Sequence, residues 1–143
     1  MKKPCFFCDI QEQKDDDKRI MENEHFFARY DDFAISPGHC EIIPKEHHPS
    51  FFDLTPEQLT ACYALIKETQ AILEEEFHPD GYNIGINEGE AAGRTQHHLH
   101  IHIIPRYVGD VENPRGGVRH IIPKKADYIP ELKKMKGREK YAD

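Results

Sequence analysis

The chain has 143 residues, of which 38% are hydrophobic, and this length fits one domain with a single modest core. Its formal net charge of −7 argues against binding to nucleic acid through the phosphate backbone. No apolar run approaches the roughly 20 residues needed to cross a bilayer, and no apolar segment of a secretory signal follows the N-terminus. We therefore expect a cytoplasmic protein without nucleic-acid or membrane partners, whose four cysteines are thiols or metal ligands rather than disulfides.

Two strands are predicted in the first third of the chain. A polar loop over 11–18 precedes the loosely alternating residues 26–30, which predict the first strand. Residues 36–38 have the composition of a turn. They lead into a second predicted strand over 39–43, which we expect Pro44 to end.

The clearest local signal predicts a helix that begins at Pro56. Thr55 is a capping residue, Pro56 occupies the first helical position, and Gln58 completes a capping box. Residues 79–81 should end this helix after Phe77. Its apolar side chains form one stripe, which should pack on a sheet or a partner helix: Leu59, Cys62, Tyr63, Ile66, Leu73 and Phe77.

The remaining elements complete the predicted fold. Residues 82–87 form a strand, 88–93 a loop of small residues, and 98–104 another strand that Pro105 should end. Because strands, one long helix and further strands follow in that order, we predict an α+β fold with a largely antiparallel sheet. We expect a single domain over residues 1–143.

Charge is distributed unevenly along the chain. Residues 15–17 form an acidic turn, whereas about 124–143 is a basic tail that we interpret as a solvated helix or a frayed end. Just before this tail, Arg115 and Arg119 fit two interpretations equally well. They either bind further phosphates of a substrate or lie in a surface loop.

A row of histidines carries the chemical signal. Alternate side chains of a strand share a face, so the aliphatic residues should enter the core while His98, His100 and His102 line the opposite face. The outer two would lie about 13 Å apart, which is too far for all three to hold one metal ion. The row instead fits divided roles, in which one imidazole attacks, one handles the leaving group's proton and one orients the others.

The loop before the row suits an anion. Its glycines, Gly89 and Gly93, let the backbone approach a ligand closely. Arg94 and Thr95 then add a cation and a hydroxyl, and both can bind a phosphoryl group.

The alternation over 98–104 resembles the motif of the histidine-triad (HIT) family. Further matching segments make the resemblance run from about Cys5 to Tyr107: Asp31, 36–39, 43–47, 87–89 and 104–106. The resemblance implies an antiparallel sheet of about five strands with one long helix, paired into a homodimer with a continuous sheet. It also implies a hydrolase or transferase that cleaves the α-phosphate linkage of a purine nucleotide conjugate, such as a phosphoramidate or a dinucleoside polyphosphate. The expected intermediate is a covalent nucleotidyl-histidine.

The resemblance also implies residue roles. His100 would be the nucleophile, His102 would contact the phosphate and the leaving group, and His98 would hydrogen-bond behind His100 to fix its tautomer. The other matched positions would contact substrate. These are His39 beside the phosphate, Asp31 at the ribose hydroxyls, Asn87 and Thr95 near the α-phosphate, and Arg94, which adds a permanent charge where many members have Gln.

A second site is suggested by Cys5 and Cys8. A C-x-x-C pair alone fits a redox site, a metal site or chance, and the βαβ context of a thioredoxin-like site is missing. In bacterial-type members of the family such a pair joins two histidines around a structural zinc, and the matching residues here are His47 and His98. Four such ligands would close the site to water. No organic cofactor is expected.

Two other functions compete with the covalent enzyme. One is a nucleotide-binding regulatory protein with little turnover, and the other is a zinc hydrolase that uses metal-bound water. The complete histidine row together with His39 favours an enzyme. The sequence specifies neither the leaving group nor the base.

Overall fold

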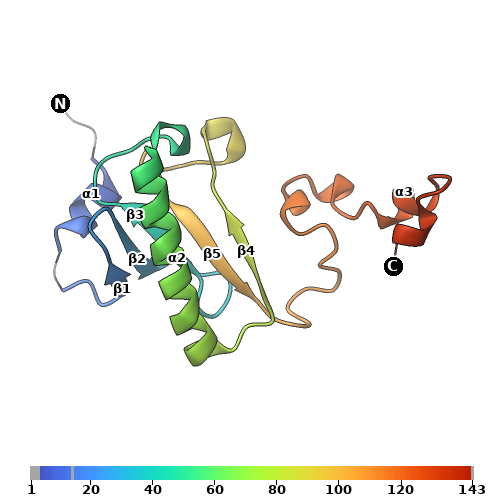
Figure 1. Cartoon of the computed structure of the whole chain (residues 1–143), viewed down its shortest axis with the longest axis horizontal. Coiled ribbons are helices and arrows are strands. Elements are labelled where there is room, and N and C mark those ends of the chain that lie inside the picture. The colour runs from blue at the N-terminus through green and yellow to red at the C-terminus, as the bar shows by residue number, and fades with distance from the viewer. Residues whose placement is uncertain (1–3, 14, 143) are drawn as a thin grey trace. The chain divides into compact units, whose positions relative to one another are not determined.

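The computed structural model describes residues 4–13 and 15–142, and the chain forms two compact units, Met1–Tyr107 and Val108–Asp143. Residues 1–3, where no secretory signal is predicted, and Lys14 of the predicted polar loop lie outside the described residues. The first unit holds a five-stranded antiparallel sheet in the order β1-β2-β3-β5-β4 (Figure 1). This confirms the predicted α+β fold. The elements of this unit are α1 (Phe6–Gln11), β1 (Arg19–Glu22), β2 (Phe26–Tyr30), β3 (Cys40–Pro44), α2 (Pro56–Phe77), β4 (Gly81–Gly85) and β5 (Ile101–Arg106), with short 3-10 helices at Phe51–Asp53 and Glu90–Ala92.

Helix α2 has both of its predicted ends. The Gln58 amide donates to the Thr55 hydroxyl at 3.1 Å, and the Thr55 amide donates to the Gln58 side chain at 2.9 Å. This capping box satisfies backbone donors that the first helical turn leaves unpaired. The helix ends where His78 adopts a left-handed conformation with φ of 50°.

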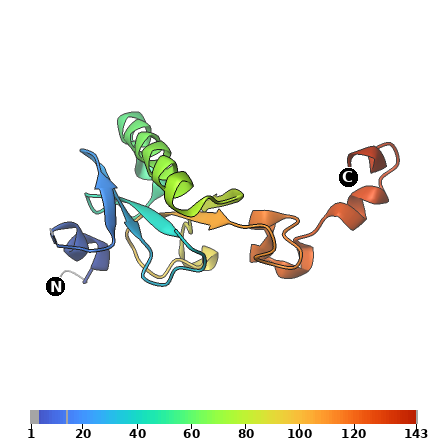
Figure 2. The same ribbon diagram turned by 90° about the horizontal axis from the view of Figure 1, so that it is seen from below.

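The sheet is buried on both faces, which explains why β2 and β3 are apolar along most of their length. Helix α2 covers one face, and α1 lies on the other (Figure 2). On the α2 face, Cys62, Leu65 and Leu73 pack against strand residues that include Ile42 and Ile103. On the other face, the core comprises Phe7, Ile10, Phe27 and Ile43.

Some predicted details are wrong. Strand β5 begins at Ile101 rather than at residue 98, and it includes Pro105. A strand can include a proline wherever the neighbouring strand does not need a backbone N–H from that residue. In the predicted stripe of α2, Leu59 and Tyr63 are exposed, since the sheet covers a narrower face than the apolar pattern suggests. Helix α1 and strand β1 were not predicted, because both are short.

The second unit consists of 3-10 helices at Gly117–Ile121, Pro123–Lys125 and Glu139–Tyr141 around α3 (Ile129–Lys133). Among its described residues only Ala126 and Ala142 are buried, so it has little core of its own. The Arg119 guanidinium donates to the carbonyls of Ala126 at 3.0 Å and Lys125 at 2.7 Å. These bonds favour the surface-loop interpretation of Arg119 over a phosphate contact.

Within the described part of the chain, every helix is too short or too polar to cross a bilayer.

Candidate active site

The imidazole of His100 is oriented by the backbone that precedes it. Its Nδ1 lies 2.9 Å from the carbonyl oxygen of His98. Because a carbonyl only accepts hydrogen bonds, Nδ1 carries the hydrogen, and the neutral ring keeps its lone pair on Nε2. The Phe7 ring packs against this imidazole with ring centroids 4.9 Å apart. The backbone carbonyl of His98, and not its side chain, therefore orients this imidazole.

A second chain of hydrogen bonds sets the tautomer of His102. The Ile35 amide donates to Nδ1 of His39 at 3.1 Å, so a neutral His39 carries its hydrogen on Nε2. That Nε2 lies 3.0 Å from Nδ1 of His102 and donates to it. The hydrogen of His102 is consequently on its own Nε2.

Both of these histidines are neutral near pH 7. Burial lowers the pKa of His39, although the Asp31 carboxylate opposes this shift. Burial, together with His100 and His39, lowers the pKa of His102 to about 4. The rings of His100 and His102 are 5.1 Å apart, and they offer opposite groups at Nε2, a lone pair on one and a hydrogen on the other.

Asp31 lies against this pair of histidines. One carboxylate oxygen accepts from the Phe33 amide at 2.7 Å. The other lies 3.4 Å from Nε2 of His39 and 3.6 Å from Nδ1 of His102. Burial raises the pKa of Asp31, but the bonds from Phe33 and Glu41 and the nearby histidines outweigh burial and lower it. Asp31 is therefore an anion beside the histidines.

Cys5, Cys8, His47 and His98 form a separate cluster. Their ligand atoms all lie within 4.8 Å of one another. The sulfur atoms lie close to the Nδ1 atoms, at 3.4 Å for Cys5–His98, 3.3 Å for Cys8–His47 and 3.5 Å for Cys8–His98. Ligands of one tetrahedral zinc ion are separated by roughly 3.3–3.8 Å, given its usual bond lengths. The Nε2 of His98 donates to the Pro44 carbonyl at 2.8 Å, which leaves the Nδ1 lone pair directed at the cysteines.

Asp31, His39 and His102 are equally close to one another, but their hydrogen bonds oppose metal binding. A ligating Nε2 of His39 would need its hydrogen on Nδ1. There the Ile35 amide already donates, so the two hydrogens would collide. The two clusters therefore differ in chemistry: the first is a hydrogen-bonded set, and the second has the donor set of a zinc site.

The HIT domain family profile matches residues 12–109 of this chain. The chain belongs to the HIT domain family. The match covers both the His98–His102 segment and His39, and the first compact unit ends close to its C-terminal boundary, at Tyr107.

Similar proteins include both uncharacterised and named members of the HIT family. An uncharacterised HIT-like protein of Methanocaldococcus jannaschii is 35% identical over 133 residues, which is 93% of this chain and 99% of that protein. A bis(5'-adenosyl)-triphosphatase of Dictyostelium discoideum is 38% identical over 100 residues, 66% of this chain and 67% of that protein. The crystal structure of a zinc-bound histidine-triad protein from Mycobacterium smegmatis is 35% identical, with a TM-score of 0.68 and coverage of 76% and 79% of the two chains.

In this HIT domain, the Arg94 side chain already binds other groups of the protein. Its guanidinium donates to the Pro49 carbonyl and lies 3.3 Å from Glu88. Glu88 also accepts from the Phe51 amide at 2.7 Å and from the Ser50 hydroxyl at 3.1 Å. These bonds join the loop before the histidines to the loop that follows His47. Of the other expected substrate contacts, Asn87 is partly buried and Thr95 is exposed.

Sequence reasoning missed two buried acidic residues of the HIT domain. Asp16, in the predicted acidic turn, has a side chain that is only 3% exposed and forms a 3.0 Å ion pair with Arg29. Glu41 lies on β3 with 6% of its surface exposed, and it bonds to Asp31. An isolated charged residue inside the predicted strand over 39–43 was the available signal, because an acidic side chain is rarely buried without a specific partner.

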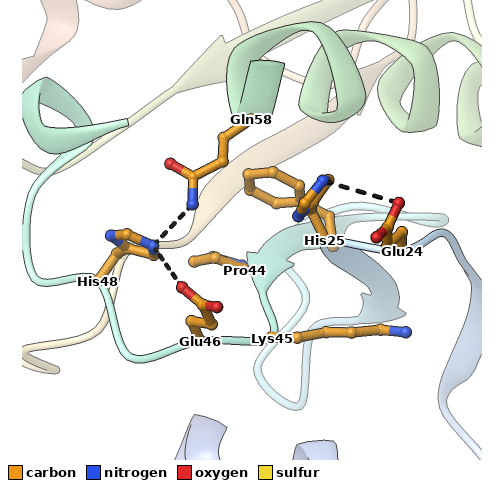
Figure 3. A pocket seen from close by; sticks show the side chains of 8 residues that line it. Glu24, His25, Pro44, Lys45, Glu46, His48 and Gln58 are labelled. Carbon is orange, nitrogen blue, oxygen red and sulfur yellow. Dashed lines mark hydrogen bonds and ion pairs between the residues drawn. The ribbon is translucent and has the colours of Figure 1, made fainter. Parts of the chain in front are cut away.

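A small pocket of the HIT domain lies between the start of α2 and residues 44–48 (Figure 3). Within it, His48 lies 3.1 Å from the Gln58 amide and 3.4 Å from Glu46. The His48 carbonyl also accepts from the Leu99 amide at 2.6 Å. The same residue that caps α2 thus holds the segment after His47 in place.

Proposed function

We propose that this protein is a nucleotidyl hydrolase or transferase that cleaves the α-phosphate linkage of a purine nucleotide conjugate through a covalent intermediate on His100. The observation that carries the proposal is the 2.9 Å bond from Nδ1 of His100 to the His98 carbonyl, which leaves Nε2 as a nucleophile. Substrate classes are suggested by relatives of this chain, among them the bis(5'-adenosyl)-triphosphatase of Dictyostelium. Phosphoramidates and dinucleoside polyphosphates are the substrates we propose.

The proposed reaction has two displacements. Nε2 of His100 attacks the α-phosphorus, and the bond to the leaving group breaks. The leaving group accepts a hydrogen bond from Nε2 of His102 and takes its proton from solvent. Water then attacks the phosphorus, the bond to His100 breaks, and the water's proton is released to solvent. The hydrogen-bond chain through His39 supports this role, because it places the hydrogen of His102 on Nε2.

We propose that His39, Asn87, Thr95 and Arg94 contact the phosphoryl oxygens and that Asp31 binds the ribose hydroxyls. For Arg94 this requires the guanidinium to share its bonds to Glu88 and Pro49 with the substrate or to exchange them. Preorganised donors at a phosphoryl group stabilise the charge that develops during attack.

We also propose a structural zinc ion held by Cys5, Cys8, His47 and His98. The fit of the ligand distances to a tetrahedral ion supports it, as does the zinc-bound Mycobacterium relative. Bound zinc would cross-link the N-terminal segment to the residues before β5, and it would take no part in the reaction of the substrate. Because Phe7 lies between the two cysteines and packs on His100, this cross-link would also hold the nucleophile's neighbour in place.

We further propose a homodimer with a continuous sheet, in which the whole chain acts as one HIT domain. β4 is an edge strand of the sheet, and Ile84 on it is 52% exposed. Leu59 and Tyr63 on α2 are exposed apolar residues that suit the same contact. A monomer mass in light scattering at micromolar concentration would exclude the dimer.

The decisive experiment is a substrate panel followed by intact-mass detection of an adduct. Adenosine phosphoramidates, diadenosine tri- and tetraphosphate and adenylyl sulfate should be offered to the purified protein. An added nucleoside monophosphate mass that maps to His100 supports the proposal. The alternative, a nucleotide-binding regulatory protein, would bind nucleoside monophosphate but form no adduct and turn over none of the panel.

A further inference from the structure

Three neighbouring strands place a row of polar side chains on the sheet face opposite α2. In register, Glu41 of β3 pairs with Arg29 of β2 on one side and with His102 of β5 on the other. Arg29 is 3% exposed and Glu41 6%. A charged or polar row this deeply buried has to be satisfied by specific partners, because an unpaired buried charge is strongly destabilising.

Arg29 is already committed to other carboxylates. Its guanidinium binds both oxygens of Asp16, at 3.0 and 3.3 Å, and both oxygens of Asp32, at 3.3 and 3.4 Å. Glu41, its neighbour in the register, instead has a carboxyl oxygen within 4.8 Å of ring nitrogens of His100 and His102. Asp31 lies 3.6 Å from the same His102 ring, which brings the two carboxyl groups together, and they interact by a hydrogen bond. Two carboxyl groups can share a hydrogen bond only if one of them is protonated.

We propose that Glu41 is a positioning residue for the histidine chemistry, acting as a buried carboxylic acid that donates a hydrogen bond to Asp31 and fixes this carboxylate beside His39 and His102. The inference rests on the proposed nucleotidyl transfer for its effect on turnover. The placement of the buried Glu41 beside His100 and His102 stands on the fold.

The charges around Glu41 agree with a neutral acid. Burial and the Asp31 carboxylate raise the pKa of Glu41 to about 8, whereas Arg29 lowers it by less. The titratable groups around it come from β2, from β5, from the residues just before β3 and β5, and from the loop after β2: Arg29, His102, His39, His100, Asp31 and Asp32.

The proposed role of the acid is to preserve the tautomer of His102. Asp31 lies 3.6 Å from Nδ1 of His102, the atom that accepts from His39. If Glu41 ionised, the added negative charge would repel Asp31 and would favour a proton on that Nδ1. His102 would then lose the arrangement in which Nε2 alone carries hydrogen.

Two substitutions separate the effect of the Glu41 hydrogen-bond donor from the effect of its side-chain volume. Glu41→Gln keeps a neutral donor for Asp31, whereas Glu41→Leu keeps a similar volume and removes the donor. We expect Glu41→Gln to keep kcat within about threefold of the parent at pH 7, and Glu41→Leu to lower kcat about 10- to 100-fold with little change in KM, as misplacement of catalytic groups does. The parent should lose activity as the pH rises through about 8, and Glu41→Gln should not.

Ile43→Val is the matched control, because Ile43 is buried on the same strand and the same face. It should lower stability without altering kcat or the pH profile. If Glu41→Leu matches the parent, or if Glu41→Gln loses as much activity as Glu41→Leu, the proposed role is overturned.

A second readout does not depend on activity. In protein with ¹³C-labelled carboxyl groups, the Glu41 carbon should titrate near pH 8 and the Asp31 carbon below its ordinary range. Titration of Glu41 at its ordinary pKa would overturn the proposal. Should the parent turn over none of the substrate panel, the proposed function fails, and this titration still decides whether Glu41 donates to Asp31.

Discussion

The two histidine clusters of this domain use the same side chain for different chemistry. In the zinc-like cluster, Nε2 of His98 donates to a backbone carbonyl and Nδ1 faces two cysteines. In the other cluster, Nδ1 of His100 donates to a backbone carbonyl and Nε2 keeps the lone pair. His98 and His100 are only two residues apart.

The difference shows that the group bonded to one ring nitrogen decides what the other nitrogen can do. A carbonyl at one nitrogen leaves a lone pair at the other, and an amide or a donating imidazole leaves a hydrogen there. His102 receives a donor, whereas His98 and His100 each receive a carbonyl. The four predictions that follow are ordered from the largest expected effect to the smallest, and the first two test this division directly.

Replacement of the proposed nucleophile should have the largest effect. We expect His100→Ala to abolish the nucleotidyl adduct and to lower kcat by roughly four orders of magnitude or more, as loss of other covalent nucleophiles does. Nucleoside monophosphate should still bind, because other residues make the proposed contacts. His97→Ala is the control, since His97 is exposed and lies near the same row. An adduct that maps to His102 would show that the two imidazoles have the opposite roles.

Loss of the cysteines should act on stability first. We expect Cys5→Ser with Cys8→Ser to remove about one zinc ion per chain and to lower Tm by roughly 10 °C or more. Activity should fall by a smaller factor, through loosening of Phe7 from His100. Cys40→Ser with Cys62→Ser offers a control, because both are buried outside the cluster. Unchanged zinc content by elemental analysis, in protein purified without a His-tag, would contradict the ligand assignment.

Glu41 should make stability depend on pH in a defined window. Its folded pKa of about 8 exceeds its ordinary value of 4.5, so its contribution is fully present below pH 4.5 and is lost as the pH rises through 8. The free energy of unfolding of Glu41→Gln should therefore rise relative to that of the parent between those limits. The rise should be up to about 1.4 kcal/mol per pH unit and a few kcal/mol in total. Urea unfolding at pH 5, 7 and 9 measures the difference. A difference that stays constant with pH would rule out a raised pKa.

His102 makes stability depend on pH in the opposite direction, and it does so at lower pH. Its folded pKa of about 4 lies below its ordinary value of 6.5, so its contribution is present above pH 6.5 and is lost as the pH falls through 4. This contribution is common to the parent and to Glu41→Gln. It therefore cancels in the difference between the two curves.

Arg94 should have the smallest effect. We expect Arg94→Gln to keep substantial activity while changing the ranking of substrates in the panel, because Gln lacks the charge but can still donate hydrogen bonds. Loss of the Arg94–Glu88 ion pair should also loosen the joined loops slightly. Lys67→Gln, a charge change on the surface of α2, serves as the control. Identical behaviour of Arg94→Gln and the parent over the whole panel would refute a role at the phosphate.

Much of the fold was predictable because its signals are local. The ends of α2 follow from Thr55, Gln58 and the residues after Phe77, which act through neighbouring backbone groups. Strand β2 follows from its own run of mostly apolar residues. The short α1 and β1 could not be predicted in the same way. They hold their conformation through contacts with distant residues, such as Phe7 with Ile43.

The candidate site, like the fold, was predictable from the sequence only in part. The sequence by itself determined which residues have chemistry to offer: the histidine row, the cysteine pair and the loop before them. Only the tertiary structure decided how these residues are used. It placed the His98 carbonyl under His100, the Ile35 amide under His39, and Glu41 against Asp31. A tautomer or a protonation state depends on which group lies about 3 Å away in space, and residue spacing along a strand does not contain that information.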